Sequence, residues 1–182
     1  MKRITVGSVV VCSLLIASAA LADAYGDLMK AQTAFQNAKS WHAEERFSDG
    51  RTVLVDYAAP ERWRIQPTPT MTELVIGGDV YMVRNGTPMK MPFGGMMISR
   101  MIKQFMVAAD PEVRKTAQDL GTRTLNGRLV HGYSFTVRGV PETLYLGDDS
   151  LPVQAEVKNS GATTVISYSK FNEPVTIEAP TS

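Results

Sequence analysis

The sequence predicts an α+β protein: a strongly curved antiparallel sheet that forms an unclosed, half β-barrel, with helices against its concave side. Two observations lead to this prediction. Segments of alternating apolar and polar residues recur from Trp41 to Phe171, with a turn signal about every ten residues. Two segments have a helical period instead, and each carries an apolar stripe. A sheet of about ten strands twists and curls, so both stripes are expected on its concave face.

The first 22 residues have the pattern of a cleavable signal peptide. Lys2 and Arg3 form a charged start, an apolar stretch follows from residue 6 to residue 20, and Ala20-Leu21-Ala22 is a small-x-small cleavage site. An uncleaved membrane anchor is the alternative, but the apolar stretch is short for a membrane span. We therefore expect a signal peptide at residues 1–22 and a single domain at residues 23–182.

Composition indicates the compartment of that domain and limits its candidate partners. Cys12 is the one cysteine and falls in the signal peptide, so the exported chain would have neither disulfides nor thiol chemistry. A cysteine-free exported chain fits a bacterial periplasm. Without Lys2 and Arg3 the chain keeps 17 basic and 18 acidic residues and has no basic block, which makes nucleic acid a poor candidate partner.

The domain opens with an expected helix at residues 24–39. Its apolar stripe consists of Leu28, Ala31, Ala34, Phe35 and Ala38. Six strands are expected next, at residues 41–47, 51–57, 62–65, 74–76, 80–83 and 88–91. Between the last of these, Gly77-Gly78-Asp79 and Asn85-Gly86 have the composition of hairpin turns.

The second half returns to strands after the central helical segment, which Asp110-Pro111 is expected to end. Five strands are expected there, at residues 115–121, 128–138, 142–146, 152–159 and 163–171. The outer face of the sheet is expected to be polar. Its expected occupants include Arg46, Arg62, Arg64, Lys90 and Lys158.

Six of the chain's ten methionines lie between Met89 and Met106. An amphipathic helix of about three turns is predicted there, with an apolar face formed by Met97, Ile98, Met101, Ile102, Phe105 and Met106. Methionine adapts to irregular apolar contacts. This helix is therefore either a permanent core element or a movable lid over an apolar cavity, with Gly94-Gly95 as a hinge. Binding of Cu(I) by the thioethers is a third interpretation, but no histidine lies nearby in the sequence.

Several motifs follow the order of one known family. Phe47-Ser48-Asp49-Gly50 ends the first strand, and Pro60-Glu61-Arg62-Trp63-Arg64 forms a Pro-x-x-aromatic-Arg corner. A Gly-Asp turn then precedes Tyr81, residues 148–153 form an Asp-rich turn that ends in Leu-Pro, and residues 168–180 are similar to the family's final strand. With these motifs the sequence resembles the lipoprotein-carrier superfamily, the LolA-type lipoprotein-sorting proteins and their lipid-binding relatives, over nearly all of residues 23–182.

The resemblance implies an unclosed β-barrel whose hydrophobic cavity takes acyl chains, with helices as a lid. One position departs from the family pattern. The best-known carriers have an arginine directly before the corner proline, where it hydrogen-bonds the lid, and this chain has Ala59 there. The latch is therefore either missing or supplied by another residue.

The expected ligand contacts lie on the inner faces of strands beside the lid and on the lid itself. They are Trp63, Ile65, Tyr81, Met91, Phe93, Met97, Met101, Ile102 and Phe105. Ordinary core packing is the alternative for the aromatic members of this set. In a half-barrel, however, the wall of the core and the wall of the cavity are the same surface.

Catalytic chemistry has little support in the sequence. His42 and His131 lie in expected strands with no histidine or cysteine at ligand spacing. Asp148-Asp149 is explained by a turn, and the neighbours Glu44 and Glu45 point to opposite faces of a strand. The sequence has no Ser-His-Asp order, nucleotide loop or zinc signature. We expect no enzyme activity, no cofactor and no metal.

The sequence thus predicts a monomeric periplasmic carrier of a Gram-negative bacterium. Such a carrier binds the acyl chains of lipoproteins, or free lipid, and moves them toward the outer membrane. A donor complex at the inner membrane and an acceptor at the outer membrane would be its partners. The alternative is a non-transporting relative, a sensor or accessory protein that binds a protein partner through the same concave face.

Overall fold

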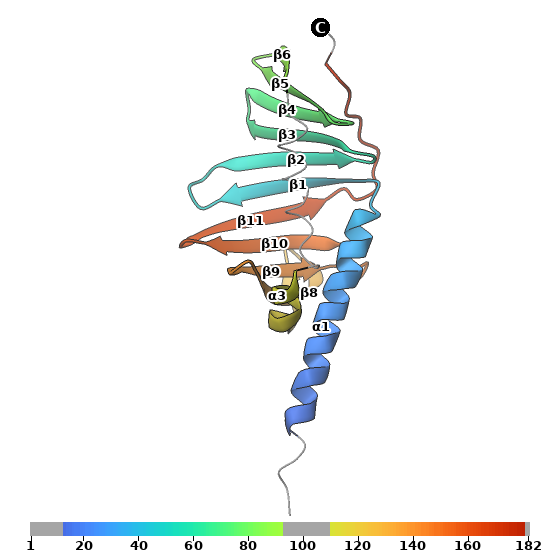
Figure 1. Ribbon diagram of the computed structural model, residues 1–182, viewed down its shortest axis with the longest axis vertical. Coiled ribbons are helices and arrows are strands. Elements are labelled where there is room, and N and C mark those ends of the chain that lie inside the picture. Colours follow the sequence, from blue (N-terminus) through green and yellow to red (C-terminus); the bar gives the residue numbers. More distant parts are fainter. Residues whose placement is uncertain (1–12, 93–109, 181–182) are drawn as a thin grey trace, which may run out of the picture.

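Eleven antiparallel strands form one sheet in the computed structural model, which describes residues 13–92 and 110–180 (Figure 1). The strands are β1 (Ser40–Phe47), β2 (Thr52–Ala58), β3 (Arg62–Thr68), β4 (Met71–Ile76), β5 (Asp79–Arg84), β6 (Thr87–Lys90), β7 (Gln118–Leu125), β8 (Arg128–Val137), β9 (Val140–Leu146), β10 (Pro152–Asn159) and β11 (Ala162–Ser169). Their order across the sheet is β6-β5-β4-β3-β2-β1-β11-β10-β9-β8-β7. The sheet is not closed, because β6 and β7 are its two edges.

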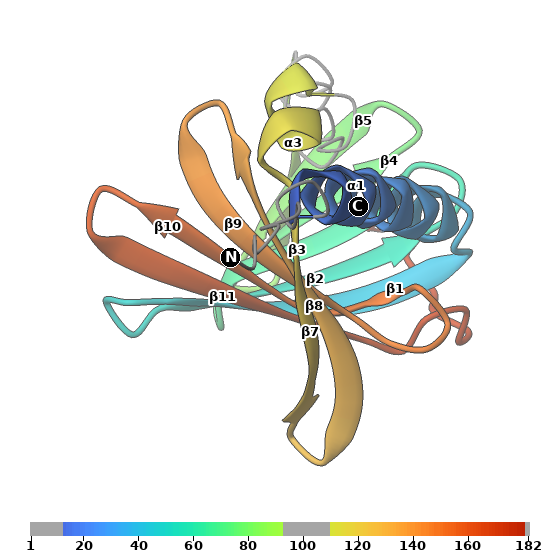
Figure 2. The same ribbon diagram turned by 90° about the horizontal axis from the view of Figure 1, so that it is seen from below.

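The sheet curls around two helices, as Figure 2 shows. Helix α1 (Ser13–Gln36) crosses the ends of the strands on the concave side, and the short helix α3 (Pro111–Thr116) lies beside it. This is the predicted α+β half-barrel. The predicted Met-rich lid helix is at residues 97–106, which lie outside the described residues, and α3 is a different element.

Most strand neighbours are joined by tight hairpins, which explains why local sequence predicts them well. Asn85 and Gly86 have φ values of 50° and 80°, and Asn126 and Gly127 have the same values. Positive φ at both central residues is the conformation of a type I′ turn, whose twist matches that of two antiparallel strands. The pairing of β1 with β11 is the exception, since it joins strands far apart in the sequence.

Both described helices differ from the prediction at their ends. Helix α1 ends at Gln36 and starts at Ser13, upstream of the predicted start at residue 24, because the alanines and leucines between Ser13 and Ala24 favour a helix. Asp110-Pro111 begins α3, and the helix that it was expected to end lies outside the described residues. The Asp110 carboxylate accepts a hydrogen bond of 2.9 Å from the Glu112 N–H, and proline suits the first helical turn.

Side chains from α1, α3 and the concave face pack in one apolar cluster. Its buried members are Ala24, Leu28, Ala31, Val113, Ala117, Tyr133, Phe135 and Leu146. A second, aromatic-rich cluster lies under the end of α1, where the Trp41 ring packs at 5.1 Å from Phe35 and at 5.4 Å from Trp63. The two clusters together hold α1 on the sheet from Ala24 to Phe35.

The segment after β11 crosses the convex face of the sheet. The last strand was expected at residues 163–171, and β11 ends at Ser169. Residues 172–180, part of the segment that resembles the family's final strand, have no regular secondary structure. Ile177 is buried against Ala58 and Leu74 in a third cluster. The Arg62 guanidinium donates to the Ile177 carbonyl at 2.7 Å. We call residues 172–180 the C-terminal strap.

The convex face is therefore only partly polar. Register places Arg46, Arg62, Arg64, Lys90 and Lys158 on it, as predicted. The apolar patch of β2, β4 and β5 on the same face is covered by the strap.

We predict that Ile177→Ala lowers the free energy of unfolding by about 2–4 kcal/mol, because Ile177 is 1% exposed and its loss leaves a cavity. Chemical denaturation measures the change. Leu129→Ala is the control, since Leu129 is 66% exposed. Equal effects of the two substitutions would show that the strap contributes nothing to stability.

Candidate functional site

An apolar cavity of about 320 Å³ lies between α1 and the sheet. Its roof consists of Leu28, Ala31, Gln32 and Phe35 from α1, and Val113 of α3 closes one side. The floor comes from β1 and from β8 to β11, the half of the sheet that curls under both helices. The cavity is thus a gap in the packing between the helices and the sheet.

The floor follows directly from the strand register. Ile166 pairs with Ala155, and Ala155 pairs with Leu144, so three apolar side chains from neighbouring strands form one row. Val157 and Phe135 belong to the next row, two residues along, which points to the same face. Regular alternation of apolar residues on four adjacent strands therefore builds most of the floor, but Glu142 lies between Val157 and Phe135 in the second row.

Two carboxyl groups and one phenol interrupt that surface. Glu45 on β1, Glu142 on β9 and Tyr168 on β11 all line the cavity. Burial raises the pKa of Glu142 from 4.5 to about 7, and burial also raises the pKa of Glu45. The pKa of Tyr168 is raised mainly by burial, with smaller contributions from the charges of Glu45 and Glu142. Both carboxyls are therefore close enough to act on the same phenol.

Helix α1 is also held by a polar contact beside the cavity. The Tyr133 hydroxyl donates to the Asp27 carboxylate at 3.0 Å. The Lys30 ammonium is 2.8 Å from the other oxygen of that carboxylate, and it is the main reason why the pKa of Asp27 is lowered. This bond joins β8 to the helix that roofs the cavity.

Four of the predicted ligand contacts lie outside this cavity. Trp63 and Ile65 are on the concave face but belong to the aromatic-rich cluster around Trp41, in the other half of the sheet. Tyr81 pairs with Leu74 and packs with Ile177 on the convex face, so it points away from the concave side. Met91 follows β6, with its N–H donating to the Val80 carbonyl at 2.8 Å. None of these four residues lines the cavity.

The remaining predicted contacts cannot be placed. Phe93, Met97, Met101, Ile102 and Phe105 lie outside the described residues, as do Gly94-Gly95. Their role remains a prediction.

Sequence reasoning missed Glu45 and Glu142, although a signal for them was present. Glu45 alternates in phase with Trp41, Ala43 and Phe47, the apolar face of its strand. Glu142 is likewise in phase with Leu144 and Leu146. A carboxylate at an inward position of an otherwise apolar strand costs free energy unless it is hydrogen-bonded or paired. This cost singles out the two positions as candidates for a role in the site.

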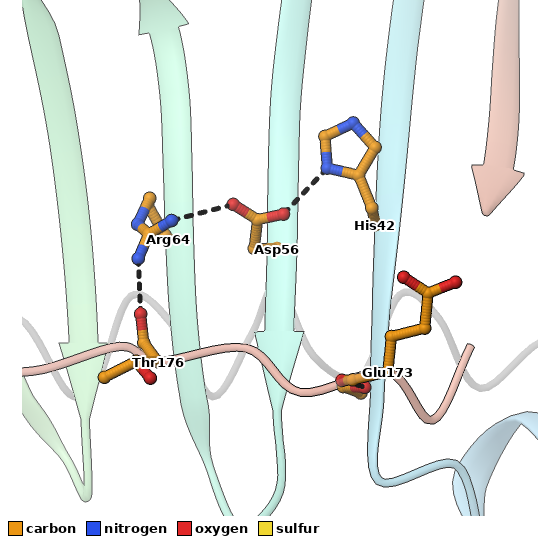
Figure 3. Close-up of polar contacts among 6 residues, drawn as sticks. His42, Asp56, Arg64, Glu173 and Thr176 are labelled. Carbon is orange, nitrogen blue, oxygen red and sulfur yellow. Dashed lines mark hydrogen bonds and ion pairs between the residues drawn. The ribbon is translucent and has the colours of Figure 1, made fainter. Parts of the chain in front are cut away.

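A second hollow, of about 270 Å³, lies on the convex face beneath the strap. Figure 3 shows its polar network: His42 Nδ1 is 2.7 Å from one oxygen of Asp56, and Arg64 donates to the other at 3.2 Å. Arg64 also donates to the Thr176 carbonyl at 2.5 Å. Because Asp56 and Arg64 satisfy each other and the strap, we interpret this network as a structural anchor.

The other singled-out polar groups also have structural roles. His131 is hydrogen-bonded to Asp119 on the neighbouring strand. Asp149 accepts from the Leu151 N–H at 3.1 Å, which is the expected turn contact. Within residues 13–92 and 110–180, no group of three or more His, Cys, Asp or Glu side chains could hold a metal ion. No helix in the same residues has the length and apolar character needed to cross a membrane.

An unclosed antiparallel barrel with helices on its concave side and an apolar cavity beneath them has the LolA-like fold that the sequence motifs suggested. Two solved structures share it. The lipoprotein LppX of Mycobacterium tuberculosis is 14% identical, with a TM-score of 0.65 over 86% of this chain and 99% of that one. LprF of Mycobacterium bovis is 17% identical, with a TM-score of 0.66 over 88% and 98% of the two chains. At such identities the similarity establishes the fold alone. No family model and no curated protein sequence matches the chain.

We predict that Glu142→Gln stabilises the protein at pH 8 by about 1–2 kcal/mol, a value reduced to allow for solvent in the cavity. The pKa of Glu142 in the folded protein, about 7, lies above the ordinary value of 4.5 for a glutamate. Below about pH 4.5 the carboxyl is protonated in the folded and the unfolded chain, and its full contribution to stability is present. This stability is lost as the pH rises through 7, because the carboxyl must then ionise in the cavity. Denaturant unfolding at pH 5 and at pH 8 measures the difference, which shrinks at pH 5.

Glu156→Gln on β10 is the matched control, because Glu156 pairs with Thr143 on the convex face. Identical pH profiles for Glu142→Gln and the unmodified protein would contradict the assignment of Glu142 to an apolar environment.

Proposed function

We propose that the protein is a periplasmic carrier that binds the acyl chains of lipids or lipoproteins in the cavity beneath α1. The observation that carries the proposal is the cavity itself, whose floor is mainly apolar and spans four adjacent strands. Its volume of about 320 Å³ is at the lower end of the range for small-molecule sites, which begins at about 300 Å³. A slender alkyl chain suits a site of this size better than a bulky ligand does.

Apolar burial alone would supply useful affinity. Each methylene group removed from water contributes about 0.8 kcal/mol, so ten of them give about 8 kcal/mol before the costs of association. The net affinity is what remains after the costs of association are subtracted, and it increases with each further methylene that is buried. The site therefore needs no elaborate polar recognition to hold a lipid.

Opening of the site would involve α1, because α1 forms its roof. The arginine latch of the best-known carriers is absent at Ala59, whose N–H donates to the Lys39 carbonyl. Arg62 and Arg64 cannot replace it from where they lie, since both face the convex side and bind the strap. We infer that apolar contacts and the Tyr133–Asp27 hydrogen bond hold the roof in place.

The signal peptide predicted at residues 1–22 supports export, and a donor and an acceptor membrane complex are the partners that such a carrier would require. Extraction of the purified native protein with organic solvent, followed by mass spectrometry, tests the proposal. Recovery of stoichiometric lipid supports a carrier. If no lipid is recovered and no fluorescent acyl probe binds, the carrier proposal fails, and a protein partner for the concave face becomes the better hypothesis.

We predict that Val157→Trp reduces binding of an acyl probe about tenfold or more, because Val157 lines the cavity and an indole there fills space that the ligand needs. Fluorescence titration measures the change, and thermal unfolding checks that the variant folds. Lys158→Trp is the control, since Lys158 is the next residue on the same strand and its side chain is exposed on the opposite face. Equal binding by both variants would place the ligand elsewhere.

A further inference from the structure

The cavity contains a chemical asymmetry that a purely apolar site would lack. The titratable groups among its described lining residues are Glu45, Glu142 and Tyr168, and no lysine, arginine or histidine is among them. A site evolved only for alkyl chains has no reason to include two carboxyls, because placing charge in apolar surroundings is expensive.

Neither carboxyl has a hydrogen-bond or ion-pair partner among the residues that the structure describes. The contrast with their neighbours is direct. Glu44, next to Glu45 in the sequence, faces the convex side and is 2.8 Å from Arg46. Glu156, beside Glu142 in the sheet, accepts from the Gln154 amide at 3.0 Å. The convex carboxylates Glu44 and Glu156 are thus satisfied by neighbouring side chains, whereas no described residue satisfies the two carboxyls in the cavity.

Unsatisfied acceptors in a cavity act on a ligand's polar group in two ways. A hydroxyl or ammonium group can donate to a carboxylate oxygen, which recovers part of the desolvation cost. A free carboxylate or another anion at the same place meets like charge, and at the reduced dielectric of a protein this repulsion costs more than in water. The preference therefore depends on the charge and the donors of the ligand's head group and not on its alkyl chain.

We propose that Glu45 and Glu142 determine ligand specificity: the cavity takes single-chain amphiphiles whose polar group carries a hydrogen-bond donor and no negative charge, and it disfavours free fatty acids. This inference rests on the proposed lipid-binding function and names its ligand class. A long-chain alcohol and a long-chain amine represent the favoured class. A fatty acid of equal chain length represents the disfavoured one.

The test uses dodecanol, dodecylamine and laurate, which have the same chain length and different head groups. Each is titrated at pH 8 against the delipidated protein preloaded with the uncharged dye N-phenyl-1-naphthylamine, and dye displacement gives the affinities. We expect laurate to bind about tenfold or more weakly than dodecanol, and dodecylamine at least as tightly as dodecanol. In Glu45→Gln, in Glu142→Gln and most clearly in the double variant, the three affinities converge to within about threefold.

Glu44→Gln and Glu156→Gln are the matched controls, since they remove one carboxylate each from the same region but from the opposite face. They should keep the full discrimination against laurate. The single variants preserve the test if the double variant does not fold, which thermal unfolding reports.

The outcomes separate this inference from the function on which it rests. Equal binding of laurate and dodecanol, or discrimination that survives in both single variants, overturns the assignment of specificity to Glu45 and Glu142 while lipid binding stands. Binding of none of the three amphiphiles, and no dye uptake, overturns the proposed function as well. Loss of discrimination in the convex-face controls would likewise exclude a local role for the two cavity carboxyls.

Discussion

The pairing of β1 with β11 is the contact on which the rest of the structure depends. It is the one strand pair that local hairpins do not create, and it joins the two halves of the sheet. Its register sets Glu45 opposite Ile166 and so fixes which residues of β1 meet the cavity floor. It also brings the chain that leaves β11 beside Ser40, whose carbonyl accepts from the Asn172 N–H at 2.9 Å. The cavity and the strap both start from this pair.

The two faces of the sheet are covered in different ways. On the concave side, α1 covers the strands incompletely, and the space that remains is a cavity lined by apolar side chains and two carboxyls. On the convex side, the strap covers an apolar patch closely, and backbone carbonyls satisfy Arg62 and Arg64. One face is therefore closed by extended chain with fixed polar contacts. The other is closed by a helix, mainly through apolar contacts.

Much of the fold could be predicted from the sequence because its determinants are local. Alternation identified the strands, and Asn-Gly turns with positive φ identified hairpins. The candidate site was harder, because it depends on contacts between distant segments. Tyr81 seemed to face inward, but the register of β4 and β5 places it on the convex face, and a shift of one residue is enough to exchange the faces. Position 45 shows the opposite failure: its inward phase was visible, but only the β1–β11 pairing and the course of α1 reveal the cavity next to it.

The central position of β11 also has a consequence for how the molecule is made. Strands β1 to β6 can form hairpins as soon as they are synthesised, but the free edge of β1 stays unpaired until the last strand arrives. That edge belongs to a strand with Trp41, Ala43 and Phe47 on one face, a combination prone to pair with another chain. A chain whose N-terminal end becomes available first would therefore pass through an aggregation-prone stage. Its folding rate would be set by the pairing of β1 with β11, which are more than a hundred residues apart in the sequence.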